Sequence, residues 1–362
     1  MKLKRILSIL SMACFFTTNI AIGQEDTTQV EEEDWSIYDN LDFADEGTKR
    51  FASVKIKGLS PAQLISIGYD YQAPYDITAG AFSSYQEETA NVLLTHGVRI
   101  GADVPVISRN NLIVQLGGQF WDFAYDLDRA PGSTHPLLNS LGQNGLKTFG
   151  LKATVYKPLN EFSFLLIQAN ADMNGDYSLS EFQSLNYNRY SAAALWGRRP
   201  NDYLQWGVGL SRTYRAGELN YIPVILYNKT SLSGKWGTEI LFPARGHVRY
   251  RVNARSLVLG GFELEGNSYR IGNQNMALAA PFDELELRRS ELRFRLNYQR
   301  QIVGFIWMSV QVGYRVMYSF NVDAVPEGKD FFRGFFGDQP FAMENSAGNP
   351  LYANFSINLV SP

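Results

Sequence analysis

The chain is poor in cysteine and histidine, and its main part has no long apolar run. Its 362 residues include one Cys and three His. The single thiol, Cys14, lies near the N-terminus, which excludes disulfides, cysteine-ligated metal sites and cysteine nucleophiles from the rest of the chain. After the first residues no segment has ~18 consecutive apolar residues, so the sequence predicts no transmembrane helix.

Aromatic residues are abundant although the chain is not hydrophobic on average. The sequence has 23 Phe, 20 Tyr, 6 Trp and 31 Gly, and its mean hydropathy is -0.19. Apolar side chains must therefore be concentrated on particular faces of the structure. The formal net charge of -3 at pH 7 likewise averages segments of opposite charge.

The N-terminus has the pattern of a secretory signal peptide. The basic residues Lys2, Lys4 and Arg5 precede an apolar stretch at 6–16, too short to span a bilayer, and a small-residue cleavage site at 21–23. We therefore expect residues 1–23 to be a signal peptide. A lipoprotein signal ending at Cys14 is the alternative, although Ser11 stands where that signal normally has an aliphatic residue.

Residues 24–49 are strongly acidic. Their ten acids are Glu25, Asp26, Glu31, Glu32, Glu33, Asp34, Asp39, Asp42, Asp45 and Glu46. A like-charged stretch with few apolar residues is typical of a solvated, flexible segment. The sequence predicts a flexible periplasmic leader, and a docking segment for an envelope partner is the alternative.

From residue 50 onward, apolar and polar residues alternate with a period of two. In the clearest run, apolar residues from Ile306 to Tyr318 alternate with others such as Gln311 and Arg315. This run has about 15 residues, longer than the usual strand of 5–6. A tilted transmembrane strand needs ~9–11 residues plus extensions into the loops. The pattern therefore favours membrane-spanning strands with one apolar face.

The alternation predicts about fourteen strands, and twelve or sixteen are also compatible with it. The predicted strands are 62–73, 89–105, 111–124, 146–157, 162–173, 188–196, 203–213, 219–228, 235–242, 246–253, 256–270, 284–299, 302–320 and 350–360. Residues 52–58 are expected to form a lead-in strand or a pairing tail. Pro243 marks either a tight loop or a bend in one long strand, because proline cannot donate to a ladder.

The connections between these strands alternate in length. Short turns are expected near 108–111, 158–160, 197–202, 253–256 and 300–301, and long polar loops at about 74–88, 125–145, 174–188, 271–283 and 321–349. Aromatic residues at the predicted strand ends suit interfacial girdles: Tyr69, Tyr71, Phe120, Trp121, Phe123, Trp196, Tyr203, Trp206, Tyr250, Tyr298, Tyr318 and Phe320.

A sheet in hydrocarbon cannot leave an edge unpaired. Residues 50–362 are therefore expected to form an all-β, transmembrane, antiparallel up-and-down β-barrel. Its expected place is the outer membrane of a Gram-negative bacterium, with the leader in the periplasm. The expected partners are outer-membrane lipid and, during biogenesis, the barrel assembly machinery.

Three motifs lie close together in the later part of the chain. They are Leu-Phe-Pro-Ala-Arg-Gly-His-Val-Arg-Tyr-Arg at 241–251, Leu-Val-Leu-Gly-Gly at 257–261 and Gly-Asn-Ser-Tyr-Arg at 266–270. They resemble an uncharacterised family of outer-membrane β-barrel proteins that is defined by a domain of unknown function and is common in Bacteroidetes-like bacteria. The resemblance implies a fold and a location, and no substrate or catalytic residue. One departure is the C-terminus, Val360-Ser361-Pro362, since barrel proteins commonly end in an aromatic residue that the assembly machinery reads.

Charged residues on four consecutive predicted strands lie opposite the apolar faces. The candidate lumen-lining residues are Arg249, Arg251, Glu263, Glu265, Arg289, Glu291, Arg293, Arg295 and Arg315. One interpretation is a salt-bridged interior that fills and stiffens the barrel. The other is a cationic constriction for anionic solutes, because the six Arg exceed the three Glu in this set.

Other site chemistry has weaker support. Residues 172–178, expected in a long loop, have the oxygen spacing of a calcium site, but Tyr177 and Gln183 replace the Gly and Glu that such a loop requires, which favours a solvated loop. His96 faces lipid and parity offers it no Ser or acid partner, so lipid hydrolysis is a remote alternative. No cofactor, metal site, catalytic residue or nucleic-acid partner is predicted.

The predicted function is non-enzymatic: passive passage of small polar or anionic solutes, or a structural role in the envelope. The alternative is a surface-interaction barrel whose long loops bind a partner. The cluster Phe331, Phe332, Phe335 and Phe336 in the last long loop fits that alternative, and it equally fits a plug that folds into the lumen.

Overall fold

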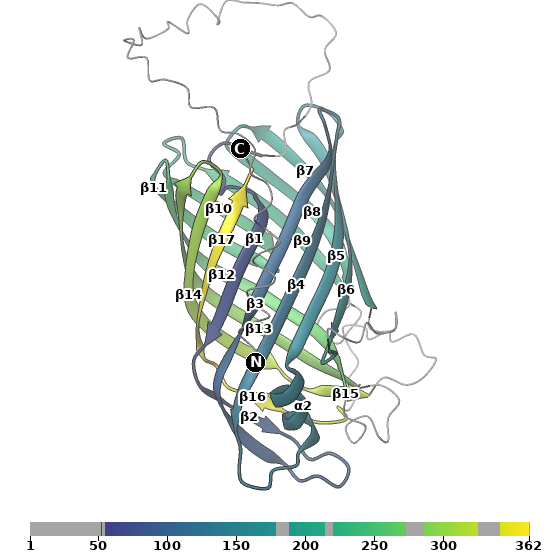
Figure 1. Cartoon of the computed structure of the whole chain (residues 1–362). Coiled ribbons are helices and arrows are strands. Elements are labelled where there is room, and N and C mark those ends of the chain that lie inside the picture. Colours follow the sequence, from purple (N-terminus) through teal and green to yellow (C-terminus); the bar gives the residue numbers. More distant parts are fainter. Residues whose placement is uncertain are drawn as a thin grey trace, which may run out of the picture. The chain divides into compact units, whose positions relative to one another are not determined.

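The computed structural model describes residue 52 and residues 55–178, 188–213, 220–272, 285–324 and 341–361. The predicted signal peptide, the acidic leader and the Phe331–Phe336 cluster lie outside the described residues. The described strands form a closed antiparallel barrel of 14 strands (Figure 1), which confirms the predicted fold class. No helix in the described ranges has the length and apolar character needed to cross a bilayer.

The wall is built from strands that each pair with the next along the chain. They are β1 (Gln63–Gln72), β3 (Glu88–Arg109), β4 (Leu112–Asp128), β5 (Leu146–Pro158), β6 (Ser163–Gly175), β7 (Asn188–Asn201), β8 (Leu204–Thr213), β9 (Asn220–Thr230), β10 (Trp236–Phe242), β11 (Arg245–Asn253), β12 (Ser256–Ile271), β13 (Leu285–Val303), β14 (Ile306–Ser319) and β17 (Leu351–Val360). Strand β1 pairs with both β3 and β17, which closes the barrel.

Short segments extend the wall beyond the barrel at one end. These are β2 (Tyr75–Ala79), β15 (Val322–Ala324), β16 (Ser346–Ala347) and the helix α2 (Pro136–Asn144). Strand β2 continues the pairing with β3, β15 pairs with β13, and β16 pairs with β2. We call this end the long-loop mouth, and the opposite end, where the hairpin turns are short and β17 ends, the short-turn mouth (Figure 1).

The strand bounds differ from the predicted ones mainly at the short turns, since β3 continues to Arg109 and β7 to Asn201, past the predicted ends at 105 and 196. The turn expected at 300–301 was wrong, because β13 continues to Val303 and the chain reverses at Gly304. Gly304 has a φ of 49°, which the tight turns of two-residue hairpins require and glycine adopts easily. Pro243 lies in the tight turn between β10 and β11, so the tight-loop alternative is correct.

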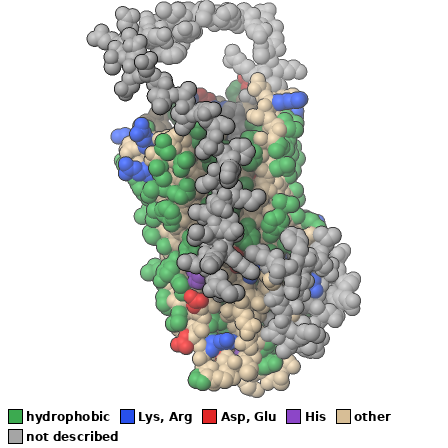
Figure 2. All heavy atoms as spheres, viewed as in Figure 1, with side chains coloured by type: hydrophobic (Ala, Val, Ile, Leu, Met, Phe, Trp, Pro, Cys, Tyr) green, Lys and Arg blue, Asp and Glu red, His purple; other side chains and the backbone are tan. Residues whose placement is uncertain are grey.

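The outer face of the wall is apolar over its middle part. Exposed residues on alternate positions include Ile67, Leu151, Val208, Leu296 and Val312. Figure 2 shows hydrophobic side chains over the barrel wall. A continuous apolar exterior on a closed sheet is the structure of a transmembrane β-barrel, the kind found in bacterial outer membranes.

Three of the predicted girdle aromatics point inward instead. Phe123 and Phe320 are buried in an apolar core, and Trp121 packs against it. The girdle assignment was wrong for them because the interior at the long-loop mouth is itself apolar. Period-two alternation identifies the lipid-facing side of a strand only where the other side is polar. Where the inward and outward side chains are both apolar, the sequence cannot show which of them meets lipid.

Candidate functional site: the barrel lumen

An apolar core fills the long-loop mouth. It joins residues from β2, β3, β4, β12, β13 and β15 to three leucines of α2: Leu137, Leu138 and Leu141. The three leucines are at most 1% exposed. Pro136 begins α2, where proline's fixed φ suits the first helical turn. We call this core, with the segments that form it, the plug.

The β12–β13 hairpin reaches over the same mouth to strands that are not its neighbours in the wall. Arg270 of β12 forms a parallel bridge with Gly175 of β6. Glu286 of β13 forms an ion pair with Arg189 of β7. These contacts link walls that are separated by several strands around the barrel, so the mouth is bridged by backbone as well as filled by side chains.

Asp176, just beyond β6, joins three parts of the plug. Its Oδ2 accepts hydrogen bonds from Ser140 Oγ of α2 at 2.6 Å and from the Gly272 amide at 3.1 Å. Burial raises the pKa of the Asp176 carboxyl, and the hydrogen bonds from Ser140 and Gly272 act in the opposite direction. The plug therefore contains a polar link between β6, the helix and the β12–β13 hairpin.

A charged layer lies directly beneath the plug. Glu291 is 1% exposed, and its carboxylate contacts Arg293 Nε at 2.5 Å, Arg289 Nη2 at 3.2 Å and Arg315 Nη1 at 3.3 Å. Aromatic rings of the plug face these cations, since Arg315 lies 4.9 Å from the Tyr75 ring centroid. Cation–π contacts thus join the apolar plug to the charged layer.

One arginine links strands on separate parts of the wall. Arg99 of β3 donates from Nε to Asp70 of β1 at 2.8 Å and from Nη1 to Glu265 of β12 at 3.0 Å. Glu265 also accepts from Arg293 Nη2 at 2.9 Å. Strands β3 and β12 are not hydrogen-bonded neighbours, so this chain of ion pairs crosses the lumen.

Arg99 and Asp70 were missed as candidate lumen residues. The period-two pattern does place both on the polar face of their strands, because Tyr69 and Val98 beside them are exposed. The alternation pattern relates side chains only on consecutive strands, where pairing is local. Only the closure of the barrel brings β1 and β3 opposite β12.

The remaining candidate residues lie between the charged layer and the short-turn mouth. Arg249 is fully buried and pairs through Nε with Glu239 at 3.2 Å. Arg295 pairs with Glu263 and contacts His247 Nε2. Arg251 donates from Nη2 to the Gly58 carbonyl at 3.2 Å.

Residues before β1 cross the short-turn mouth. Of the two alternatives predicted for 52–58, the lead-in strand is not found, since residues 55–58 form no strand, and residues 53 and 54 lie outside the described residues. Instead the Ala52 amide donates to the Asn160 carbonyl at 2.9 Å and the Lys57 amide to the Asp202 carbonyl at 2.7 Å. The Ser60 amide and Oγ both donate to Glu239 Oε1. These contacts follow the turns from β5–β6 to β10.

The charged layer does not have the properties of an open anion constriction. Rings of charged side chains that select ions in a pore must face the solution. By contrast, Arg249, Arg289, Arg293 and Arg315 are at most 3% exposed. Asp70 and Glu239 add two carboxylates, and Arg99 adds one cation, to the six Arg and three Glu that the sequence predicted. The described geometry is that of a paired, buried network.

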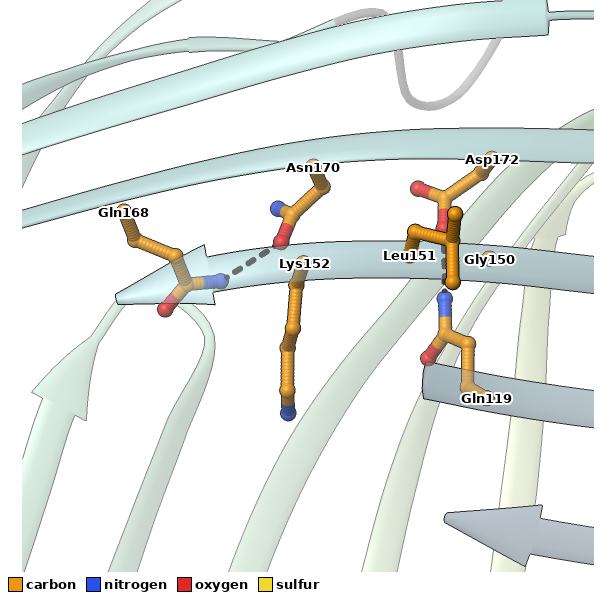
Figure 3. A pocket seen from close by; sticks show the side chains of 7 residues that line it. All are labelled: Gln119, Gly150, Leu151, Lys152, Gln168, Asn170 and Asp172. Carbon is orange, nitrogen blue, oxygen red and sulfur yellow. Dashed lines mark hydrogen bonds between the residues drawn. The ribbon is translucent and has the colours of Figure 1, made fainter. Parts of the chain in front are cut away.

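A small polar cavity of about 70 Å³ lies on the inner face of β4, β5 and β6 (Figure 3). It is lined by Gln119, Gly150, Leu151, Lys152, Gln168, Asn170 and Asp172. Gln119 Nε2 donates to Asp172 Oδ1 at 2.7 Å, and Gln168 Nε2 donates to Asn170 Oδ1 at 3.0 Å. At ~10–15 Å³ per water, the cavity has room for about five waters.

Two further expectations about sites need correction. Asp172 and Asn174 belong to β6 and not to a loop, because that strand continues to Gly175. The described residues contain no cluster of three carboxylate, His or Cys groups suited to a metal, and Gln183 lies outside them.

His96 does have an acid neighbour on the outer face, contrary to the parity argument. Its Nε2 lies 3.6 Å from Asp126 Oδ2, and its Nδ1 lies 2.6 Å from the Tyr69 hydroxyl. Asp126 is in β4, where strand pairing offsets it by two residues from His96. The hydroxyl beside the ring is a phenol and not a serine.

Comparison with known proteins gives likenesses of low score. An outer-membrane channel from Pseudomonas putida F1 is 12% identical, with 84% of this chain and 97% of that chain covered and a TM-score of 0.35. The toluene transporter TodX of P. putida is 7% identical, with 84% and 92% covered and a TM-score of 0.35. The outer-membrane protease OmpT of Escherichia coli is 10% identical, with 84% and 97% covered and a TM-score of 0.24.

No family model and no curated protein matches the chain. The resemblance to an uncharacterised Bacteroidetes-type family therefore stays a prediction. The neighbours include both channels and a protease, and at these scores they do not assign a function.

Proposed function

We propose that the protein is a non-enzymatic outer-membrane barrel of a Gram-negative bacterium that passes small polar solutes when its plug is displaced. In the described conformation the lumen is closed at the long-loop mouth. The observation that carries the proposal is the contrast along the barrel axis, with an apolar plug at one mouth and a polar inner wall below it.

The plug supports a closed resting state. Leu137, Leu138 and Leu141 are withdrawn from water against the inner faces of the wall strands. Burying a leucine side chain contributes ~1.5–3 kcal/mol, so the plug is stable but is held by side-chain packing and a few polar links. Within the plug, the α2 segment at 129–145 is not part of any wall strand, so it can leave the mouth without breaking the 14-strand wall.

The inner wall at β4, β5 and β6 supports polar cargo. Gln119, Gln168 and Asn170 present amide donors and acceptors, while Lys152 and Asp103 form an ion pair at 2.7 Å. Opposite charges and amides on the same wall favour small polar solutes of either sign over a strict anion preference.

Conductance in planar bilayers tests the proposal. The wild-type barrel is expected to show little steady current, and a variant in which residues 129–145 are replaced by a short Gly-Ser turn should open a stable conductance. A variant with Gln143→Ser and Asn144→Ser on the less buried side of α2 is the matched control and should behave as wild type. A large steady current through the wild type would contradict closure, and a correctly folded plug-deleted barrel without current would contradict passage.

A structural role in the envelope is the second candidate, and the lumen-crossing ion pairs favour it. Arg99 ties β1 and β3 to β12, and such pairs stiffen a barrel whether or not anything passes through it. If the plug-deleted variant carries no current, this role is the better account. The surface-interaction alternative depends on the long loops, notably 321–349, and the part of that loop with the Phe cluster, 325–340, lies outside the described residues.

A further inference from the structure

The short-turn mouth is surrounded by exposed cations. Each of its six hairpins contributes at least one: Arg109, Lys157, Arg198, Lys229, Lys235, Arg255 and Arg300. The described turns at this mouth contain two acids, Glu161 and Asp202. Figure 2 shows Lys and Arg side chains on both sides of this end of the barrel. Positive charge therefore follows the circumference and is not confined to one patch.

Four of these cations continue the lipid-facing columns of their strands. Lys157 follows Val155 by two residues on β5, and Arg198 follows Trp196 by two on β7. Residues two apart in a strand share a face and are about 7 Å apart along it. Trp196 is 40% exposed on the outer wall, so Arg198 points outward one step closer to the rim.

The same step from an aromatic side chain to a cation occurs on two more strands. Lys229 follows Tyr227 on β9, and Arg300 follows Tyr298 on β13. Pairing is regular through these positions, since Tyr227 and Lys229 face Trp206 and Leu204 in unbroken register. We call Lys157, Arg198, Lys229 and Arg300 the rim cations.

The rim cations are not used by ion pairs within the described residues. The ion pairs at this mouth involve Lys57 and Arg199, both with Asp202. Each rim cation lies at the end of an apolar column and has no counter-ion among the described residues, so these four cations stand where the headgroup region of a bilayer begins.

We propose that the rim cations bind the phosphate groups of anionic phospholipids in the leaflet that the short turns face. Guanidinium and ammonium groups form strong charge-assisted hydrogen bonds with phosphate oxygens. A protein partner would meet the mouth or one side of it, whereas the rim cations point away from the lumen on four of the six hairpins of this mouth. Lipid surrounds the barrel in the same way.

Tryptophan quenching measures this lipid preference directly. Trp196 and Trp236 are exposed on the outer wall near the short-turn mouth, so brominated acyl chains in contact with that part of the barrel quench their fluorescence. Full-length protein is reconstituted in phosphatidylcholine vesicles that contain brominated phosphatidylcholine or brominated phosphatidylglycerol. Phosphatidylglycerol should bind about fivefold more tightly at low salt, the factor equivalent to ~1 kcal/mol per basic side chain at an anionic surface.

Charge variants assign the preference to the rim. Lys157→Gln, Arg198→Gln, Lys229→Gln and Arg300→Gln together should bring the ratio close to one, while the charge-keeping pair Lys157→Arg and Lys229→Arg should retain it. The rim pair Arg198→Gln and Arg300→Gln should lower the ratio. Its control is Arg212→Gln, an exposed cation near the end of β8 that lies away from the short-turn mouth, which should leave the ratio unchanged.

Three results would overturn the proposal. They are equal binding of the two lipids by the wild type, an unchanged ratio in the fourfold variant, and equal losses in the rim pair and its control. Since the wild-type ratio is itself decisive, the test does not depend on the folding of any variant. Raising the salt to ~1 M, where the Debye length is about 3 Å, should reduce the ratio.

Discussion

Replacing Glu291 with glutamine should strongly destabilise the barrel. The carboxylate is the shared counter-ion of Arg289, Arg293 and Arg315. Glutamine keeps the shape of the side chain and its capacity to accept a hydrogen bond, but it removes the negative charge. The perturbation is therefore electrostatic and leaves packing almost unchanged.

The expected magnitude follows from the burial of the partners. Arg289, Arg293 and Arg315 are at most 3% exposed, so water cannot replace the lost charge. Removing one partner of a buried ion pair typically costs ~3–5 kcal/mol. Arg293 keeps Glu265 as a second partner at 2.9 Å, which limits its share of the loss. We therefore expect Glu291→Gln to lower the free energy of unfolding by about 3–5 kcal/mol and not by a multiple of that figure.

Urea unfolding in detergent micelles, followed by tryptophan fluorescence, measures the change. Glu161→Gln in the exposed β5–β6 turn is the control and should stay within ~0.5 kcal/mol of wild type. In a double-mutant cycle with Arg315→Met, the two changes should cost less together than the sum of the single changes. A Glu291→Gln protein within 1 kcal/mol of wild type, or additive losses in the cycle, would refute the argument that buried counter-ions hold this layer.

Three further predictions concern the wall, the plug and the cavity. Gly97→Ala should cost ~1–3 kcal/mol of unfolding free energy because its Cβ would overlap the Asp122 carbonyl, whereas Gly101→Ala on the same strand meets nothing within 4 Å and should be nearly neutral. Burial lowers the pKa of His135 below its ordinary value, and the hydrogen bond to the Gly80 carbonyl acts in the opposite direction. Because the folded plug disfavours the protonated ring, the plug should lose stability as pH falls below ~6.5. Protease cleavage at the long-loop mouth should therefore be faster at pH 5 than at pH 7.5, and His135→Gln should remove the difference. In the plug-deleted barrel, Lys152→Gln should shift ion selectivity toward cations more than Arg293→Gln does, because Lys152 borders the cavity and Arg293 is buried in ion pairs. A larger shift of the reversal potential in Arg293→Gln than in Lys152→Gln would restore the constriction hypothesis.

Much of the fold could be predicted because the lipid-facing side of a strand has a strict chemical requirement. On β13, Phe294 and Leu296 meet lipid and are about half exposed, while Arg293, the residue before Phe294, is buried. A strand must alternate its side chains, so one apolar face is visible in a single sequence. The turn at Gly304 was misplaced because both sides of it continue the same alternation, and the positive φ that marks it is a property of the backbone.

The candidate site could be predicted only within consecutive strands. Arg289 to Arg315 lie on neighbouring β13 and β14, where local pairing brings them together. The partners Asp70 and Arg99 lie far away in the sequence and meet Glu265 only because the barrel closes. A plug was predicted only as an alternative for the Phe331–Phe336 cluster. A plug around α2 was not predicted, because α2 is short and its leucines resemble those of any polar loop with a few apolar residues.

The sequence by itself determined the class of protein: fourteen alternating segments require a closed barrel, since hydrocarbon tolerates no unpaired strand edge. It also determined that charge would face inward, because the outward positions are apolar. Only the tertiary structure decided whether those charges line an open passage or pair with one another, and whether the described segments at 74–88 and 125–145 project or pack into the mouth. Both outcomes depend on contacts between segments far apart in the chain, and strand alternation contains no information about such contacts.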